Sequence, residues 1–148
     1  MDNLYDPTVL RSILDRITTL TASSARQWGK MDQAQMLAHC QAPLEIAVGK
    51  RHHKRGLVGF LFGGMARRKL LKPEPFGRNM PTAPFFKVTD ARQLEPERER
   101  LLALVQEFHD RGPEGVAPEH PFFGKLTPAE WSALQWKHLD HHLRQFEA

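Results

Sequence analysis

Three histidines near the end of the chain are the side chains whose type and spacing could do chemistry. They lie at positions 138, 141 and 142, inside the segment KHLDHHLRQF. With about 100° of rotation per helical residue, His138 and His142 fall on the apolar side of a helix beside Leu139, and His141 falls at its edge. An imidazole buried among apolar side chains without a hydrogen-bonding partner is costly. The placement of His138 and His142 therefore needs an explanation.

A shared metal ion would explain why His138 and His142 lie on the apolar side of the helix. Two histidines four residues apart lie one helical turn apart and can present ring nitrogens to one divalent cation, at ~2.0–2.1 Å for zinc. His39 offers a third ligand, from a predicted helix that must pack into the same core. Three neutral histidines leave coordination positions for water or substrate, as catalytic metal sites do. We therefore predict that these three histidines bind Zn²⁺, Ni²⁺ or Fe²⁺, since imidazole suits several metals.

Alternatives to this ligand set remain open. His141 replaces His142 if the helix is rotated further than assumed, and a contribution from His120 is also open. The histidines are instead structural if they are interior side chains bonded to carbonyls or carboxylates. No Asp or Glu is placed well enough to be assigned as a general base, so catalytic residues stay unassigned.

Four main helices are predicted to position these histidines. Apolar residues recur at three- and four-residue steps in each of them. Asp6, Asp32 and Thr127 are typical N-caps, and Thr127 with Glu130 makes a complete capping box. The predicted helices run from about Pro7 to Leu20, from Asp32 to Gly49, from Glu95 to Arg111, and from Thr127 through the KHLDHHLRQF segment. The pattern favours an all-α four-helix bundle.

Two features interrupt the regular helical pattern. Pro43 lies inside the second helix and has no N–H, so we expect that helix to bend there. The connection between the second and third main helices, residues 50–90, is long and irregular. A short helix over Gly56 to Leu71 is expected inside it, followed by an extended loop with four prolines. No segment shows the alternation typical of a strand.

Composition favours one soluble globular domain over residues 1–148, with 41% hydrophobic and 26% charged residues. Cys40 is the only cysteine, which excludes an intramolecular disulfide and a Cys-rich zinc site and suits a reducing cytoplasm. We expect it to be a buried, inert thiol. The N-terminal residues lack the apolar segment of a secretory signal. The longest apolar run, residues 56–66, is shorter than the ~20 residues that a membrane span needs.

The positive charge is concentrated in one segment. Residues 50–72 contain eight basic residues and no acidic one, whereas the whole chain has a net charge of +4. This segment fits an anionic thiol cofactor or substrate, the phosphates of nucleic acid, or a membrane surface. A solvated connector is the ordinary explanation for such a run. Nucleic acid is disfavoured because no recognised binding motif accompanies the charges.

The segment HPFFG, residues 120–124, immediately precedes the last helix. Its aromatic residues would either shield the mouth of a metal pocket from water or cap the hydrophobic core. Because aromatic side chains usually carry burial, we favour the structural role. Trp28, Trp131 and Trp136 are likewise interpreted as packing residues.

The segments WGKMDQAQMLAHC and HPFFGKLTPAEWSALQWKHLDHHLRQF resemble the DinB-like superfamily. They are most similar to a branch with the same HPFFG loop and late KHLDHHLRQF helix. The resemblance implies a four-helix bundle, often dimeric, with a three-histidine divalent-metal site. Residue by residue, that site corresponds to His39, His138 and His142.

Proteins of the superfamily that this chain resembles include S-transferases that use bacillithiol or mycothiol, and the mycothiol-dependent maleylpyruvate isomerase. The resemblance therefore implies a homodimer acting on a small-molecule substrate with a low-molecular-weight thiol, as a metal-dependent S-transferase or hydrolase. It does not identify the substrate. The alternative is a non-catalytic binding or stress-response bundle whose histidines are structural.

Overall fold

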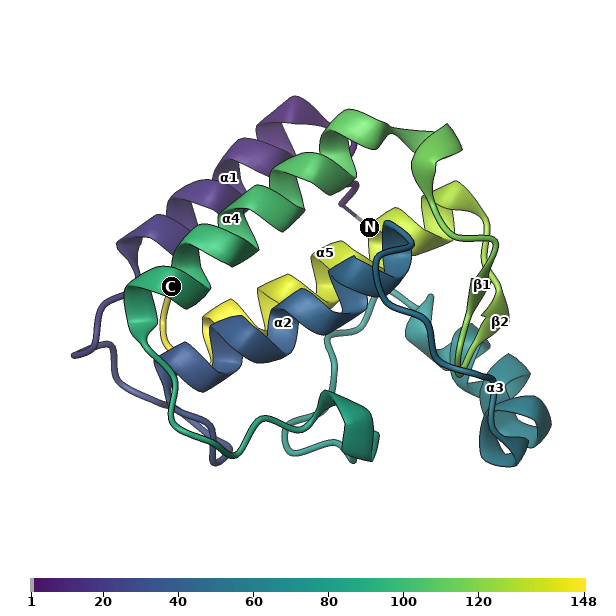
Figure 1. Cartoon of the computed structure of the whole chain (residues 1–148), viewed down its shortest axis with the longest axis horizontal. Coiled ribbons are helices and arrows are strands. Elements are labelled where there is room, and N and C mark those ends of the chain that lie inside the picture. The colour runs from purple at the N-terminus through teal and green to yellow at the C-terminus, as the bar shows by residue number, and fades with distance from the viewer. Residues whose placement is uncertain (1) are drawn as a thin grey trace.

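The computed structural model describes residues 2–148, which form a mostly helical fold as predicted (Figure 1). Those residues make five α-helices, two short 3₁₀ helices and one two-stranded sheet. In chain order, the elements are α1 (Pro7–Thr19), α2 (Gln33–Ala47), α3 (Leu57–Leu70), η1 (Pro84–Phe86), α4 (Leu94–Arg111), η2 (Pro113–Gly115), β1 (Glu119–His120), β2 (Gly124–Lys125) and α5 (Pro128–Arg144).

The helix starts predicted from capping residues are confirmed. The Asp6 side chain accepts hydrogen bonds from the first backbone N–H groups of α1. Asp32 with Gln35 caps α2, and Thr127 with Glu130 caps α5, each as a reciprocal capping box. These side chains satisfy N–H groups that have no partner inside a helix, which is why the helices begin where they do.

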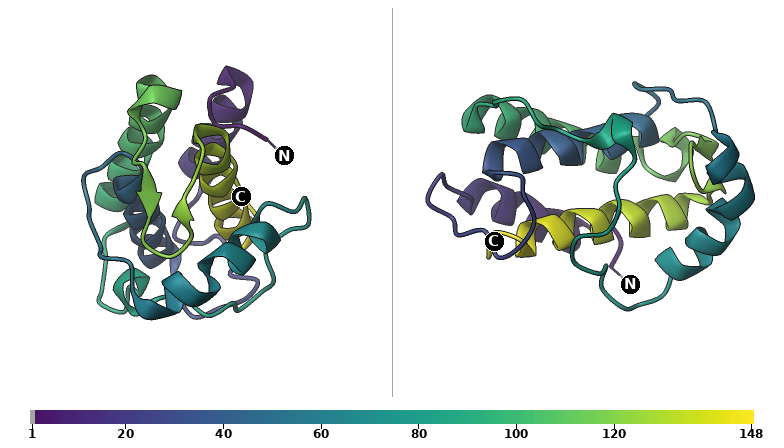
Figure 2. Two further views of the ribbon diagram at one scale, coloured as in Figure 1. Left: turned by 90° about the vertical axis from the view of Figure 1, so that its right-hand side faces the viewer. Right: turned by 90° about the horizontal axis from the view of Figure 1, so that it is seen from below.

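Four of the helices enclose the hydrophobic core. Each of α1 and α2 packs against both α4 and α5, as the two views of Figure 2 also show. The sequence predicted one apolar stripe on α2, but twelve of its 15 residues are buried. The fold therefore encloses α2 on most of its sides. This enclosure places His39 in the interior, where it is 4% exposed.

Arg98 of α4 forms hydrogen bonds with the C-terminal end of α1. Its guanidinium donates hydrogen bonds to the carbonyls of Ile17, Thr18 and Leu20, at 2.7, 2.7 and 2.5 Å. The last carbonyls of a helix lack partners within the helix. The long cationic side chain satisfies them and joins α1 to α4.

One local element of the structure was not predicted from the sequence. The sequence showed no strand, but the HPFFG segment forms the turn of a small antiparallel hairpin, in which Glu119 pairs with Lys125 and His120 with Gly124. Each strand has two residues, too few to show an alternating pattern.

At Pro43, α2 continues unbroken to Ala47, and the expected bend stays a prediction.

The short helix expected in the long connection is confirmed as α3. It lies at one end of the molecule beside the β1–β2 hairpin, outside the four core helices (Figure 1). No helix among residues 2–148 is both long enough and apolar enough to cross a membrane.

Candidate metal centre

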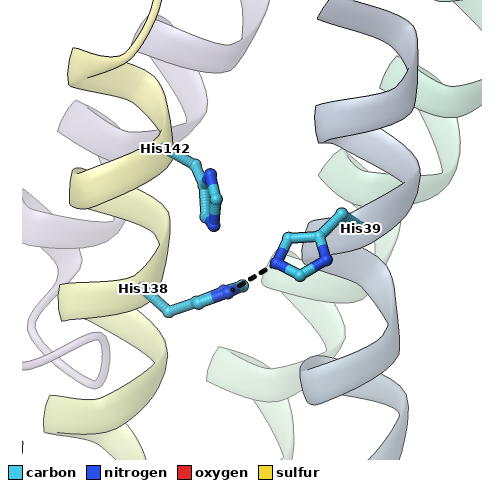
Figure 3. Close-up of side chains that lie close together, drawn as sticks. All are labelled: His39, His138 and His142. Carbon is cyan, nitrogen blue, oxygen red and sulfur yellow. Dashed lines mark hydrogen bonds between the residues drawn. The ribbon is translucent and has the colours of Figure 1, made fainter. Parts of the chain in front are cut away.

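Three histidines from two helices converge in the interior. His39 extends from α2 toward His138 and His142, which lie one turn apart on α5 (Figure 3). Each offers one ring nitrogen, and these three atoms lie within 4.8 Å of one another. The ring centroids are 5.0 Å apart for His39 and His138, and 4.7 Å apart for each of the other two pairs. The structure thus brings together the three residues singled out from the sequence.

A backbone carbonyl fixes the tautomer of His39. Its Nδ1 lies 2.7 Å from the carbonyl oxygen of Phe86 in η1. A carbonyl only accepts hydrogen bonds, so Nδ1 carries the proton and Nε2 carries the lone pair. That Nε2 faces the cluster, 3.1 Å from Nε2 of His138.

Gln145 fixes His142 in the same way. Nδ1 of His142 lies 3.0 Å from Oε1 of Gln145. The amide orientation is set by its other end, because Nε2 of Gln145 donates to the carbonyl of Trp28 at 2.6 Å. His142 therefore donates through Nδ1 and leaves Nε2 as an acceptor. Metal-bound histidines usually donate their second N–H to an oxygen in this manner.

His138 has a different environment. Within residues 2–148, its buried Nδ1 has no hydrogen-bonding partner. Since Nε2 of His39 carries a lone pair, the 3.1 Å contact requires either a proton on Nε2 of His138 or a cation between the two nitrogens. Two nitrogen ligands of a tetrahedral zinc ion stand about 3.3 Å apart. The observed spacing fits both arrangements.

All three rings are held in the neutral form that binds metals. Burial lowers the pKa of His39, and the hydrogen bond to the Phe86 carbonyl opposes this only in part. Burial, and then repulsion by the other histidines, lowers the pKa of His138 well below its usual value. Burial lowers the pKa of His142 to about 3, with His39 adding to the effect. Neutral imidazoles need lose no proton before they coordinate.

The three histidines of the cluster differ in exposure. His39 is buried, whereas His138 and His142 are partly exposed.

His141 lies outside the cluster. Its ring packs near Trp28 and Phe76, with centroids 5.5 and 5.8 Å away. It lines a cavity of about 460 Å³ together with Arg78 and Trp136. The structure therefore places His142, and not His141, beside His39.

His120 also lies elsewhere, in the β1–β2 hairpin. Its Nδ1 accepts hydrogen bonds from the backbone N–H groups of Phe122 and Phe123, at 3.0 and 3.2 Å. The ring packs near Trp131, and burial lowers its pKa to about 4. Phe123 packs against the core. These contacts support the structural interpretation of the HPFFG segment.

Cys40 is buried, as expected, and its Sγ lies 3.8 Å from Sδ of Met36. Burial raises the pKa of the thiol, so the group stays protonated and weakly nucleophilic.

Two groups that hold the site were missed in the sequence. Gln145 follows His142 by three residues on the same helical side, and this spacing was a usable signal. Phe86 acts through its backbone carbonyl, so its residue type carries no signal. Gly29 supports the same network, because a Cβ there would lie 2.4 Å from Nε2 of Gln145.

Comparison with known proteins gives a family but no described function. The sequence model of a family described as "Protein of unknown function (DUF1569)" matches residues 5–148, nearly the whole chain. No curated protein and no solved structure matches the chain. The functional argument therefore rests on the chemistry of the site.

Proposed function

The chain belongs to the DUF1569 family, and we propose that it binds a divalent metal ion through His39, His138 and His142. One observation carries the proposal. Three neutral ring nitrogens converge, and two of the three rings are held by N–H···O hydrogen bonds on their outer nitrogens. Zn²⁺, Ni²⁺ and Fe²⁺ all suit such imidazole ligands.

The groups around the cluster have separate roles in this proposal. A divalent ion bound to three imidazoles supplies a Lewis acid that lowers the pKa of a water or thiol in a remaining position. The Phe86 carbonyl orients His39, and Gln145 orients His142. The metal cluster contains no carboxylate among residues 2–148, so no side chain is assigned as a general base.

The finer proposal is a metal-dependent S-transferase or hydrolase in a DinB-like four-helix bundle, as the sequence resemblance implies. A small-molecule substrate with a low-molecular-weight thiol suits the cavity beside His141. Its walls combine the rings of Trp28 and Phe76 with charged side chains of both signs, among them Arg78, Asp140 and Glu147, which suit a polar compound with apolar parts. A homodimer and a single domain over residues 1–148 are also part of this proposal.

A non-catalytic bundle with structural histidines is the second candidate. The direct contact between His39 and His138 favours it, because a proton on Nε2 of His138 would make this a hydrogen bond between α2 and α5. Nδ1 of His138 would then be a buried acceptor without a partner.

Metal analysis separates the two candidates. The protein is expressed without a histidine tag, and its metals are measured by inductively coupled plasma mass spectrometry. We expect about one divalent ion per chain in the wild type and far less in the H39A, H138A and H142A variants. His141→Ala and His52→Ala are matched controls that should retain the metal, because both residues lie outside the cluster.

Circular dichroism checks that each variant is folded. Substoichiometric metal in the wild type, unchanged in the three cluster variants, would contradict the metal site and favour structural histidines. A retained metal without thiol-transferase or hydrolase turnover would remove only the finer, enzymatic proposal.

A further inference from the structure

Helix α3 exposes an apolar surface that nothing in the fold covers. Six of its large apolar side chains are more than half exposed, and we call them the α3 apolar face. They are Leu57 (73% exposed), Val58 (63%), Phe60 (69%), Leu61 (61%), Phe62 (53%) and Met65 (72%). A contiguous exposed apolar patch marks a surface that meets a partner.

The opposite side of α3 is firmly attached to the molecule. Gly59 and Gly63 lie against the backbone of Phe122, and a Cβ on Gly63 would stand only 2.0 Å from its carbonyl oxygen. The guanidinium of Arg67 forms an ion pair with Glu130 at the start of α5. These contacts fix which side of α3 faces outward. Because α3 lies at one end of the molecule (Figure 2), its apolar face is presented there in a defined orientation.

Positive charges flank this face at both ends. Of the eight basic residues in residues 50–72, three pair with carboxylates of the protein, namely Lys50, Arg51 and Arg67. Across residues 2–148, no carboxylate forms an ion pair with the other five, which are Lys54, Arg55, Arg68, Lys69 and Lys72.

Two of these unpaired cations share the outward side of α3. Arg68 and Lys69 follow Leu61 and Phe62 by seven residues, which is two helical turns. They therefore project in the same direction as the apolar face. Apolar side chains and cations would reach one partner together.

We propose that the α3 apolar face docks on an anionic phospholipid bilayer, with α3 lying in the plane of the interface. Helices that bind this way bury an apolar face among the acyl chains while their lysines and arginines meet anionic headgroups. The 14 residues of α3 extend about 21 Å. The hydrocarbon core of a bilayer is about 30 Å thick, so α3 lies on the membrane and does not span it.

The combination of charge and apolar surface argues against two other partners for the α3 apolar face. A second copy paired through α3 about a two-fold axis would bring unpaired cations of one copy beside unpaired cations of the other, because they lie at both ends of α3, and like charges repel. Nucleic acid would neutralise the cations but leave the α3 apolar face in water, because its backbone is bound mainly through charge. An anionic bilayer would bury the α3 apolar face among its acyl chains and pair the cations with its headgroups.

The test is flotation of the full chain with vesicles of phosphatidylcholine, with or without phosphatidylglycerol. We expect binding to the vesicles that contain phosphatidylglycerol, weakened by added salt, and little binding to phosphatidylcholine alone. Each cation near an anionic surface contributes about fivefold in affinity. The double variant Arg68→Gln/Lys69→Gln should therefore bind about 25-fold more weakly, and Phe60→Ser/Leu61→Ser should lose most binding.

Matched controls change exposed residues outside α3. Met80→Ser removes an exposed apolar side chain, and Arg11→Gln/Lys87→Gln removes two exposed charges. Both controls should bind like the wild type.

Four results would overturn the proposal. The first is no binding to vesicles with phosphatidylglycerol at low salt, and the second is binding unaffected by either α3 double variant. The third is a dimer in sedimentation velocity that Phe60→Ser/Leu61→Ser abolishes, without vesicle binding; it would assign the face to a second copy. Binding of a DNA duplex without vesicle binding would likewise assign the cations to nucleic acid. These variants leave the cluster histidines unchanged, so their metal content should equal that of the wild type. Metal analysis therefore tests the metal site independently of membrane binding.

Discussion

At the scale of single residues, the candidate metal centre depends on the groups behind the histidines as much as on the histidines. The helical period indicated that His138 and His142 share a side of α5, and His39 was found because α2 had to pack into the same core. Phe86 and Gln145 decide where the ring protons sit. A backbone carbonyl leaves no trace in the residue types, so Phe86 was not predictable from the sequence.

Gln145→Leu tests the outer hydrogen bond of His142. The leucine has a similar size but cannot accept from Nδ1, so the ring loses its fixed orientation. Loss of such a partner typically weakens metal binding by about 10- to 100-fold. Competition with a chromophoric chelator measures the affinity. Gln106→Ala on α4 is the control, and equal affinities of wild type and Gln145→Leu would contradict the assigned role.

The buried histidines also predict how the metal-free protein responds to acid. Burial lowers the pKa values of His120 and His142 to about 4 and about 3, below the value of 6.5 expected for an unfolded chain. The unfolded state then binds more protons as the pH falls below 6.5. The stabilisation is full above pH 6.5 and is progressively lost on acidification toward the folded pKa values. For His120, lowering the pH from 6.5 to 5.5 should reduce the free energy of unfolding by about 1 kcal/mol.

Urea unfolding with a chelator present measures this effect. In His120→Asn, the side-chain oxygen can accept the hydrogen bonds that Nδ1 of His120 accepts in the wild type. The acid-induced decrease in the free energy of unfolding should then be smaller by the contribution of one histidine. His52→Ala, a change at an exposed position, is the control variant. Equal wild-type stability at pH 6.5 and 5.5 would show that these rings are not held neutral.

At the scale of elements, the starts of three helices were predictable because each carries a capping side chain. Asp6, Asp32 and Thr127 cap α1, α2 and α5 as expected. The β1–β2 hairpin was not predictable, because its short ladder consists of backbone pairing without a side-chain pattern. The attachment of α3 could not be foreseen either, since two glycines in a helix do not reveal which backbone approaches them.

Neighbouring glycines of α3 offer a matched pair of substitutions. In Gly63→Ala the new Cβ would collide with the Phe122 carbonyl, so α3 must separate from the hairpin. In Gly64→Ala nothing lies within 4 Å, and alanine favours a helix by up to about 1 kcal/mol over glycine. Amide hydrogen exchange across residues 57–70 should therefore become faster in Gly63→Ala and slower in Gly64→Ala. Equal exchange in both variants would contradict the packing of α3 on the hairpin.

At the scale of the whole molecule, a metal at this cluster would join α2 to α5 and so stabilise the fold. A ligand that binds only the folded state at 100 times its dissociation constant adds about 2.7 kcal/mol. We expect zinc at that ratio to raise the midpoint of thermal unfolding by several degrees in the wild type. The His39→Ala variant should show no increase, and the His141→Ala variant should behave like the wild type. An equal increase in all three proteins would indicate binding elsewhere.

Anomalous X-ray diffraction tests the central claim most directly. Crystals of untagged protein loaded with zinc are measured above and below the zinc absorption edge. The proposed site predicts one anomalous peak between the rings of His39, His138 and His142, with ligand nitrogens at about 2.0–2.1 Å. The peak should persist in His141→Ala and vanish in His142→Ala. A wild-type map without a peak there, with the His39 and His138 nitrogens still in direct contact, would contradict the metal site and leave the histidines as structural residues.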